Sequence, residues 1–136
     1  MESARRIELG GETALELAPR AAQQDYGALL REHDVGLALM YTPHPSLVPI
    51  EMASAGLLAV TNTFENKTAA ALAEISPNLI AAEPTIDGVA AALCDATAAS
   101  DDVEARVRGS RVRWSRDWDR SFDDALIDRV RALLDA

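Results

Sequence analysis

The stretch that decides the fold is DVGLALMYTPHPSLVPIEMASAGLLAV, residues 34–60. Its residues 35–40 form an uninterrupted apolar run bounded by polar and proline-rich sequence, which suits a strand buried on both faces. A second apolar run covers residues 57–61, and Ile50–Ala55 between the two is predicted to form a short helix that ends at Gly56. A buried strand, a helix and another buried strand indicate a parallel βαβ unit.

The same alternation extends on both sides of this unit. Residues 6–9 and 14–17 alternate apolar with polar residues around a Gly-Gly pair and are predicted to be short strands. Helices are predicted from Pro19 to about Asp34, over 67–75, and from a Thr85 cap to about Ala98, with a fifth strand over 78–82.

From Asp101 onward, apolar residues at spacings of three, four or seven predict two amphipathic helices, broken near Gly109. Trp114 and Trp118 lie four residues apart and are expected to anchor this tail to the sheet, with stacking on a ligand as the alternative. The fold class is therefore α/β: a Rossmann-like, mostly parallel sheet of about five strands flanked by helices, with two C-terminal amphipathic helices.

Composition narrows the class of protein. The 136 residues fit a single domain over 1–136, and a formal net charge of -9 argues against nucleic acid or an anionic membrane as a partner. No stretch approaches the ~18 apolar residues of a membrane span, and the N-terminus lacks an apolar signal region, so a cytoplasmic protein is expected. The single cysteine, Cys94, fits a reducing compartment and is expected to be a small core residue.

The segment from Met40 to Glu51 carries the chemistry. In open parallel sheets ligands bind beyond the carboxyl ends of the strands, where helix N-termini offer free N–H groups to anions. Glu51 is expected about one turn inside the short helix, where its carboxylate could accept hydrogen bonds from two ribose hydroxyls while the helix amides hold a diphosphate. The alternative is an ordinary helix carboxylate that complements the macrodipole.

The run LALMYTPHPSLVPIEMASAGLLAVTNTFENKT, residues 37–68, resembles the donor-binding C-terminal domain of glycosyltransferases with the two-domain GT-B fold. It looks closest to the bacterial rhamnosyltransferases of surface-polysaccharide assembly. The resemblance covers roughly Leu15 to Phe122, including a Trp-containing segment over 116–122, and is most specific from His44 to Lys67.

The resemblance implies that Glu51 binds the ribose of a nucleotide-sugar donor and that the backbone around Ser46 and Leu47 meets the diphosphate. Many relatives carry two glutamates separated by seven residues, the first of which touches the donor sugar. The matching position here is Pro43. Without this first glutamate, the donor sugar could be a deoxy-sugar such as rhamnose, which has one hydroxyl fewer to bind and would be contacted by His44 or Thr42.

Three further residues are expected at the same edge of the sheet. Thr63, Asn66 and Lys67 follow the next strand, and Lys67, the only lysine, is either a neutraliser of phosphate charge or a solvated helix-start residue. His44 is either a ligand contact or a loop histidine without a role. The two histidines are separated by ten residues, no carboxylate cluster has ligand spacing, and so neither a metal nor another cofactor is expected; a dTDP- or UDP-linked sugar would be a substrate.

The resemblance also implies that a complete enzyme contains parts that this chain lacks. Transfer in a GT-B enzyme needs an acceptor domain, and the chain is one βα unit short of a complete donor domain, a unit that carries basic residues for the diphosphate. We therefore expect association with a partner chain or a homo-oligomer, and little transfer activity from the chain alone. The alternative function is a non-catalytic α/β binding or assembly module. A phospho-receiver-like domain is disfavoured because Met40-Tyr41-Thr42 lacks the required aspartate.

Overall fold

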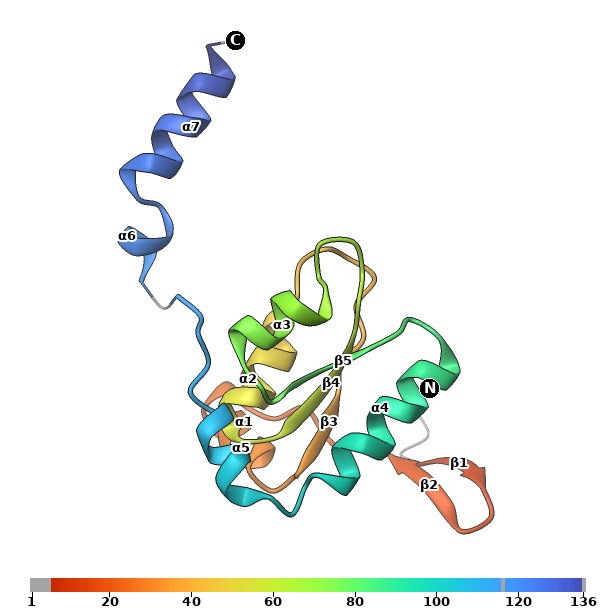
Figure 1. The fold of residues 1–136 in the computed structure, drawn as a ribbon. Coiled ribbons are helices and arrows are strands. Elements are labelled where there is room, and N and C mark those ends of the chain that lie inside the picture. The colour runs from red at the N-terminus through yellow and green to blue at the C-terminus, as the bar shows by residue number, and fades with distance from the viewer. Residues whose placement is uncertain (1–5, 116, 136) are drawn as a thin grey trace, which may run out of the picture.

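The computed structural model describes residues 6–115 and 117–135. At its centre is a parallel sheet of three strands in the order β3-β4-β5 (Figure 1), with bounds β3 (Val35–Leu37), β4 (Leu58–Asn62) and β5 (Leu79–Ala82). The helix α2 (Leu47–Ala55) connects β3 to β4, and α3 (Ala69–Ile75) connects β4 to β5. The predicted α/β class and the predicted βαβ unit are confirmed. The prediction of a strand buried on both faces over 35–40 is wrong, because β3 ends at Leu37, which is 45% exposed, and its outer edge has no neighbouring strand among the described residues.

The central strand β4 is buried along its whole length because helices cover both faces of the sheet. On one face Leu58 and Val60 pack with α4 (Ile86–Ala98), which contributes Ala92 and Ala96. On the other face Ala59 packs with residues of α2, α3 and β5, and Figure 1 shows these two helices opposite α4. Small alanines at these contacts let the helices approach the sheet closely.

The end of the sheet where the strands begin is closed by α5 (Val103–Gly109). Asn78 is 2% exposed, and its side-chain amide donates to the carbonyls of Arg106 at 2.8 Å and Ala53 at 3.3 Å. The Ser76 hydroxyl donates to the carbonyl of Gly109 at 2.7 Å. Gly109 has no room for a side chain, because a Cβ there would overlap the amide of Asn78.

A second link at this end is the Arg106 side chain, which is 14% exposed. Its guanidinium pairs with the Asp34 carboxylate at 2.7 Å and donates to the carbonyls of Ser100 at 2.7 Å and Gly56 at 2.9 Å. Gly56 ends α2 in the left-handed region at φ 97°, as its sequence position predicts. One side chain thus connects the start of β3, the end of α2 and the turn before α5.

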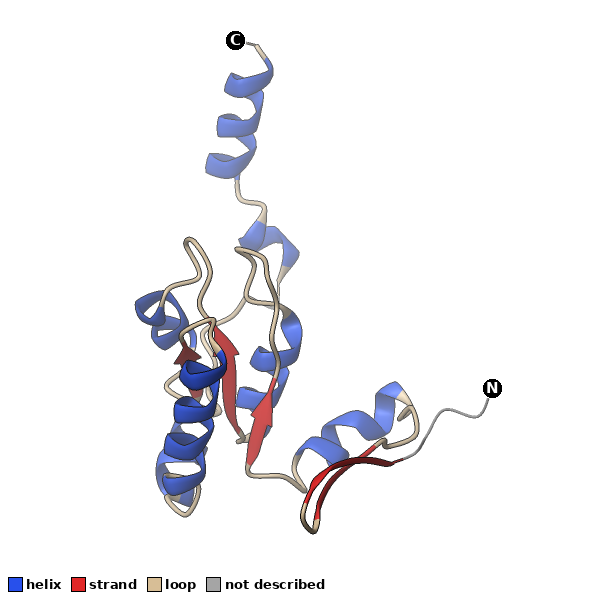
Figure 2. Ribbon diagram, turned by 90° about the vertical axis from the view of Figure 1, so that its right-hand side faces the viewer, coloured by secondary structure: helices blue, strands red, loops and turns tan. Residues whose placement is uncertain are grey.

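All five predicted strands are present, divided between two sheets. The strands β1 (Arg6–Gly10) and β2 (Thr13–Glu16) form a separate antiparallel hairpin that lies away from the main sheet (Figure 2). Its turn uses Gly10 and Gly11, both at positive φ. In the described part of the chain β3 pairs with β4 alone, so its other edge is open.

Three helices begin elsewhere than predicted. The helix α3 starts two residues later than predicted, because the Thr68 side chain caps it. The helix α1 (Gln23–Leu30) starts four residues after Pro19, because 19–22 are irregular and Ala22 is extended at the cap. The helix α2 starts three residues earlier than predicted, because Ser46 caps it with its side chain. Pro49 then falls in the first turn, where its missing N–H leaves no intrahelical hydrogen bond unmade.

The tail forms three helices rather than two: α5, α6 (Trp118–Ser121) and α7 (Asp124–Leu134). Asp117 and Asp123 each accept a hydrogen bond from the first turn of the helix that follows, so each starts a new helix. The predicted anchoring is wrong for Trp118, which is 77% exposed, while α7 leads away from the body (Figure 1). Arg116, the first residue of the predicted Trp-containing segment, lies outside the described residues.

The prediction that Cys94 is a core residue is also wrong, since the residue is exposed. The side of α4 that faces the sheet is set by Ala92 and Ala96, which are four residues apart. Cys94 lies two residues from each and therefore on the opposite side of the helix. Across the described residues, no helix combines the length and apolar character that crossing a membrane requires.

Candidate ligand site at the carboxyl ends of the strands

The end of β3 is held by side chains that follow the neighbouring strand β4. The backbone N–H of Met40 donates to the side-chain oxygen of Asn62 at 2.8 Å, and the Asn62 amide donates back to the Met40 carbonyl at 3.2 Å. The Lys67 ammonium donates to the same carbonyl at 2.8 Å. These bonds fix the point at which the loop 41–46 leaves the sheet.

Lys67 is 3% exposed, and burial lowers the pKa of its ammonium below the ordinary value of 10.5. It takes part in none of the ion pairs formed among the described residues. The predicted solvated lysine is therefore not what the structure contains. The alternative, neutralisation of a phosphate, stays a prediction, and in this geometry the ammonium is engaged by Met40.

The loop 41–46 is organised by its own polar groups. The Thr42 hydroxyl donates to the His44 carbonyl at 3.1 Å, and the Ser46 N–H donates to Nδ1 of His44 at 3.0 Å. Because Nδ1 accepts this bond, a neutral His44 carries its proton on Nε2. Ser46 has φ 70°, a conformation that residues other than glycine rarely adopt, so the loop is held in one defined path into α2.

The N-terminus of α2 offers fewer amides than its length suggests. Pro49 has no N–H, which leaves Leu47 and Val48 as the amides of the first turn. Val48 N–H lies 3.4 Å from the Ser46 hydroxyl, a long hydrogen bond that a stronger acceptor would displace. An anion at this helix end would be held mainly by the amides of Leu47 and Val48.

Glu51 lies one helical turn after Leu47, on the same side of α2, and is exposed. Both residues line a hollow of about 190 Å³, together with Ile50, Ser54, Val112 and Trp114. On its other flank Glu51 faces α1: burial, and secondly the charge of Glu51, raise the pKa of Tyr26 above 10.0. Sequence reasoning did not single out Tyr26, and no motif marks it.

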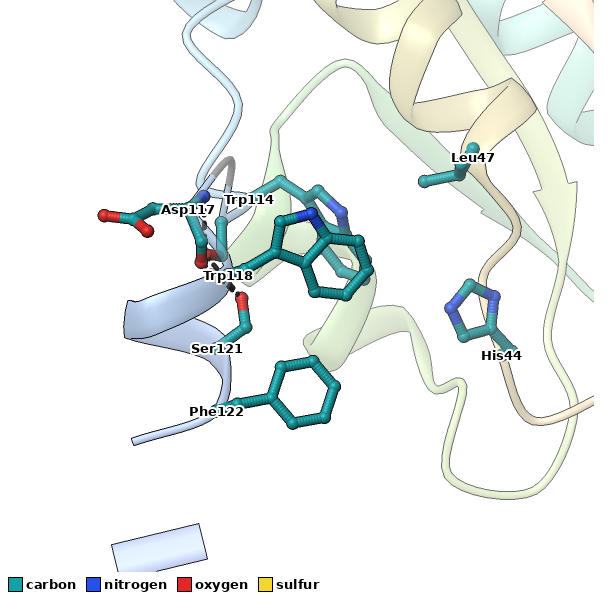
Figure 3. Close-up of a pocket in the computed structure, with 8 residues that line it drawn as sticks. His44, Leu47, Trp114, Asp117, Trp118, Ser121 and Phe122 are labelled. Atoms are coloured by element: carbon teal, nitrogen blue, oxygen red, sulfur yellow. Dashed lines mark hydrogen bonds between the residues drawn. The ribbon is translucent and has the colours of Figure 1, made fainter. Parts of the chain in front are cut away.

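A cavity near this loop is bounded by aromatic rings. Its volume is about 690 Å³, and Figure 3 shows the rings of Trp114, Trp118 and Phe122 facing His44 and Leu47 across it. Trp118 stacks on Phe122 with centroids 5.6 Å apart, and His44 meets Trp114 edge to face at 6.2 Å. We call His44, Trp114, Trp118 and Phe122 the aromatic cup. The spacing of Trp114, Trp118 and Phe122, four residues apart, was its only signal in the sequence.

A second hollow of about 630 Å³ lies on the α4 side of the same sheet end. Its lining is apolar apart from Tyr41, Asn62 and Thr85. The Asn62 side chain is hydrogen-bonded to the backbone of Met40, and the Thr85 hydroxyl accepts the Gly88 N–H at the cap of α4. It offers neither a carboxylate for hydroxyls nor a cation for phosphates.

The structure brings together Thr42, His44, Ser46 and Leu47 in one hydrogen-bonded loop and helix start, with Glu51 one turn beyond. Thr63 and Asn66 lie in the neighbouring loop, between β4 and α3, and do not join this cluster by a hydrogen bond in the described structure. The N–H and hydroxyl of Thr63 both point to the carbonyl of Ala82, whereas Asn66 is exposed. Among the described residues no group of histidine, cysteine or carboxylate side chains has the arrangement of a metal site.

Fold and site together define an α/β domain whose polar loop and helix start stand at the carboxyl end of a parallel sheet. Residues 2–94 match the family described as "WsaF, C-terminal domain". O-antigen biosynthesis protein RfbC of Myxococcus xanthus is 43% identical over 105 residues, which covers 74% of this chain and 8% of RfbC. The chain belongs to the WsaF C-terminal domain family, and the predicted resemblance to the C-terminal domain of a bacterial polysaccharide glycosyltransferase is confirmed.

Proposed function

We propose that this domain binds the nucleotide-sugar donor of a glycosyltransferase that acts in O-antigen or related surface-polysaccharide synthesis. Support comes from the family and from the relative RfbC, which is named an O-antigen biosynthesis protein. The chain spans 8% of the length of RfbC, so acceptor binding and the transfer step belong to a larger assembly. The donor we propose is a dTDP- or UDP-linked hexose or deoxyhexose such as rhamnose.

The observation that carries the proposal is the position of Glu51 on α2. Glu51 lies five residues after the cap Ser46, which corresponds to about 7.5 Å along a helix. That span suits a nucleoside diphosphate whose ribose hydroxyls bind the carboxylate while its diphosphate meets the amides of Leu47 and Val48. The carboxylate is exposed and free of ion pairs among the described residues, so it is available to accept these bonds.

Isothermal titration with dTDP, UDP and GDP tests the proposal. We expect saturable binding of one diphosphate, weakened about tenfold (~1.4 kcal/mol) in Glu51→Ala. Glu74→Ala is the matched control, since Glu74 is exposed on α3 and should leave binding unchanged. Equal binding by Glu51→Ala would remove Glu51 from the site. Absence of binding by a folded chain would mean either that the missing βα unit is indispensable or that the domain is a non-catalytic assembly module.

We also propose that another polypeptide completes the sheet. The outer edge of β3 carries backbone N–H and C=O groups with no strand beside them among the described residues, and such an edge invites pairing. The partner is a further part of the enzyme or a second copy of the chain. Light scattering measures the mass: a dimer or larger favours the second copy, and a monomer favours the first.

A further inference from the structure

Both tryptophans of the chain line the aromatic cup, although aromatic residues make up only 4% of the sequence. The Trp118 and Phe122 rings stack at an interplanar angle of 27° and remain 77% and 54% exposed. A stack that stays open to solvent stabilises the fold little compared with the same rings in a core. It does provide a flat apolar platform at the wall of a cavity.

The rim of the cup is polar and fixed. Ser121 Oγ lies 2.7 Å from Ser115 Oγ and 2.9 Å from the backbone carbonyl of Asp117. One carboxylate oxygen of Asp117 accepts the N–H of Asp119 at 3.0 Å, and Figure 3 shows the carboxylate directed away from the rings of the cup. Asp117 also lines an adjoining hollow together with Arg113 and Arg120, so charges of both signs lie at this rim. The rings and serines that line the cup itself suit a neutral ligand that carries hydroxyl groups.

The cup is continuous with the hollow beside Glu51, because Leu47 and Trp114 line both. The proposed function places the ribose at Glu51 and the diphosphate at the first turn of α2. A nucleotide sugar bound in this way extends from Glu51 toward the start of the helix. The sugar then lies on the His44 side, in the cup, and the base lies on the opposite side of Glu51. This step rests on the proposed function.

We propose that the aromatic cup binds the pyranose ring of a neutral saccharide, with an apolar C–H face against Trp118 and Phe122 and a hydroxyl group on Nε2 of His44. The ring belongs either to the donor sugar or to the acceptor glycan. Both sources present the same chemistry to the cup. The family match ends at residue 94, so it assigns no role to the cup residues of the tail.

Tryptophan fluorescence tests this, because both tryptophans lie in the cup. Trp114 also lines the hollow beside Glu51, so the response to dTDP alone is the reference for a nucleotide-linked sugar. The first probe is methyl α-rhamnopyranoside, which stands for an acceptor sugar. The second is dTDP-rhamnose compared with dTDP, which isolates the contribution of a donor-linked sugar. A saturable response to methyl α-rhamnopyranoside, or one to dTDP-rhamnose in excess of dTDP, is the expected result.

Trp118→Ala is the decisive variant, because the exposed side chain is removed without loss of core contacts. It should weaken saccharide binding at least tenfold, followed through the remaining Trp114, whereas Trp118→Phe keeps a ring and should restore most of it. Glu51→Ala should leave the response to methyl α-rhamnopyranoside unchanged and weaken that to dTDP-rhamnose.

The outcomes separate this inference from the proposed function. No response to either sugar while dTDP still binds through Glu51 overturns the cup as a saccharide site and leaves donor binding intact. A response to methyl α-rhamnopyranoside without any nucleotide binding keeps the cup and overturns the donor assignment. An equal response to dTDP and dTDP-rhamnose that Trp118→Ala abolishes places the base in the cup, which also overturns the inference.

Discussion

At the end where the parallel strands begin, buried polar side chains tie α5 to the sheet, whereas at the end where the strands finish, rings and carboxylates face solvent. Asn78 is 2% exposed at the first end, and Tyr41 is 80% exposed at the second. A buried polar group has to be hydrogen-bonded, so a substitution at the first end should lower the free energy of unfolding substantially. The second end keeps its polar groups available for a ligand, so stability and recognition are separated along the strands.

The largest effect should come from Asn78→Ala, which removes two side-chain hydrogen bonds, to the carbonyls of Ala53 and Arg106, and leaves a cavity beside Gly109. We expect the free energy of unfolding to fall by about 3 kcal/mol, measured by urea denaturation. Asn66→Ala makes the same chemical change at the exposed end and should stay within about 0.5 kcal/mol of the parent. Equal losses from the two variants would contradict the contrast between the ends.

A somewhat smaller loss is expected for Arg106→Met, because the carbonyls of Gly56 and Ser100 and the carboxylate of Asp34 lose their donor. About 2 kcal/mol is expected, read from the same denaturation curves. Arg108 lies on the same helix with its side chain 68% exposed, and Arg108→Met should cost less than about 0.5 kcal/mol. If Arg108→Met costs as much, the guanidinium network is not what closes this end.

Lys67 is an exception to this contrast between the two ends of the sheet, because it is a buried cation at the end where the strands finish. Burial lowers its pKa below 10.5, so between the lowered pKa and 10.5 the unfolded chain binds the proton more tightly than the folded chain. The free energy of unfolding should therefore rise with pH through that interval. Lys67→Met should flatten this rise. Unfolding is best followed below pH 10.0, because the raised pKa of Tyr26 has the opposite effect only above that pH.

A parallel slope in the parent and in Lys67→Met would contradict the burial of the ammonium. The variant also removes one donor from the carbonyl of Met40, which still accepts a hydrogen bond from the Asn62 amide. The change in slope is therefore the informative quantity, and the absolute stability of Lys67→Met is a separate measurement.

Thr61, near the end of β4, is a second buried polar residue at the end where the strands finish. Its hydroxyl is buried on β4 and has no hydrogen-bond partner among the described residues. Replacing it by the similarly shaped valine removes an unpaired polar group, so Thr61→Val should raise the free energy of unfolding by about 1 kcal/mol. Thr63→Val is the control, because the Thr63 hydroxyl has a partner at the Ala82 carbonyl, 3.3 Å away, and its loss should not stabilise the domain. A destabilised Thr61→Val would mean that the hydroxyl has an unrecognised role.

The sequence predicts the central unit well because its signals are local and strong. The apolar runs that became β3 and β4, the stop at Gly56 and the Thr85 cap each depend on a few neighbouring residues. The hairpin strands are equally local, but which sheet they join depends on partners distant in the chain. That is why all five strands were predicted while their division into two sheets was not.

The candidate site was predicted in part for the same reason. The loop that contains His44 and Ser46 and the helix that carries Glu51 follow from prolines and strand ends, and the structure joins them by hydrogen bonds. A solvated Lys67 was one of two alternatives that the sequence left open, because nothing local reveals that its ammonium reaches the Met40 carbonyl, 27 positions away. Trp118 looked like an anchor because a four-residue spacing does not distinguish burial against a sheet from stacking along an open wall.

The smallest change in stability should therefore come from Trp118→Ala, even though it removes the largest kind of side chain. With 77% of Trp118 exposed and Phe122 as its stacking partner, little apolar area returns to water when the indole is lost. We expect a change within about 0.5 kcal/mol by urea denaturation in the absence of ligand. Leu72→Ala, at 1% exposure, should by contrast cost about 2–5 kcal/mol. A loss above about 1 kcal/mol for Trp118→Ala would restore the anchoring role that the sequence predicts, and the open end would then contribute to stability as well as to recognition.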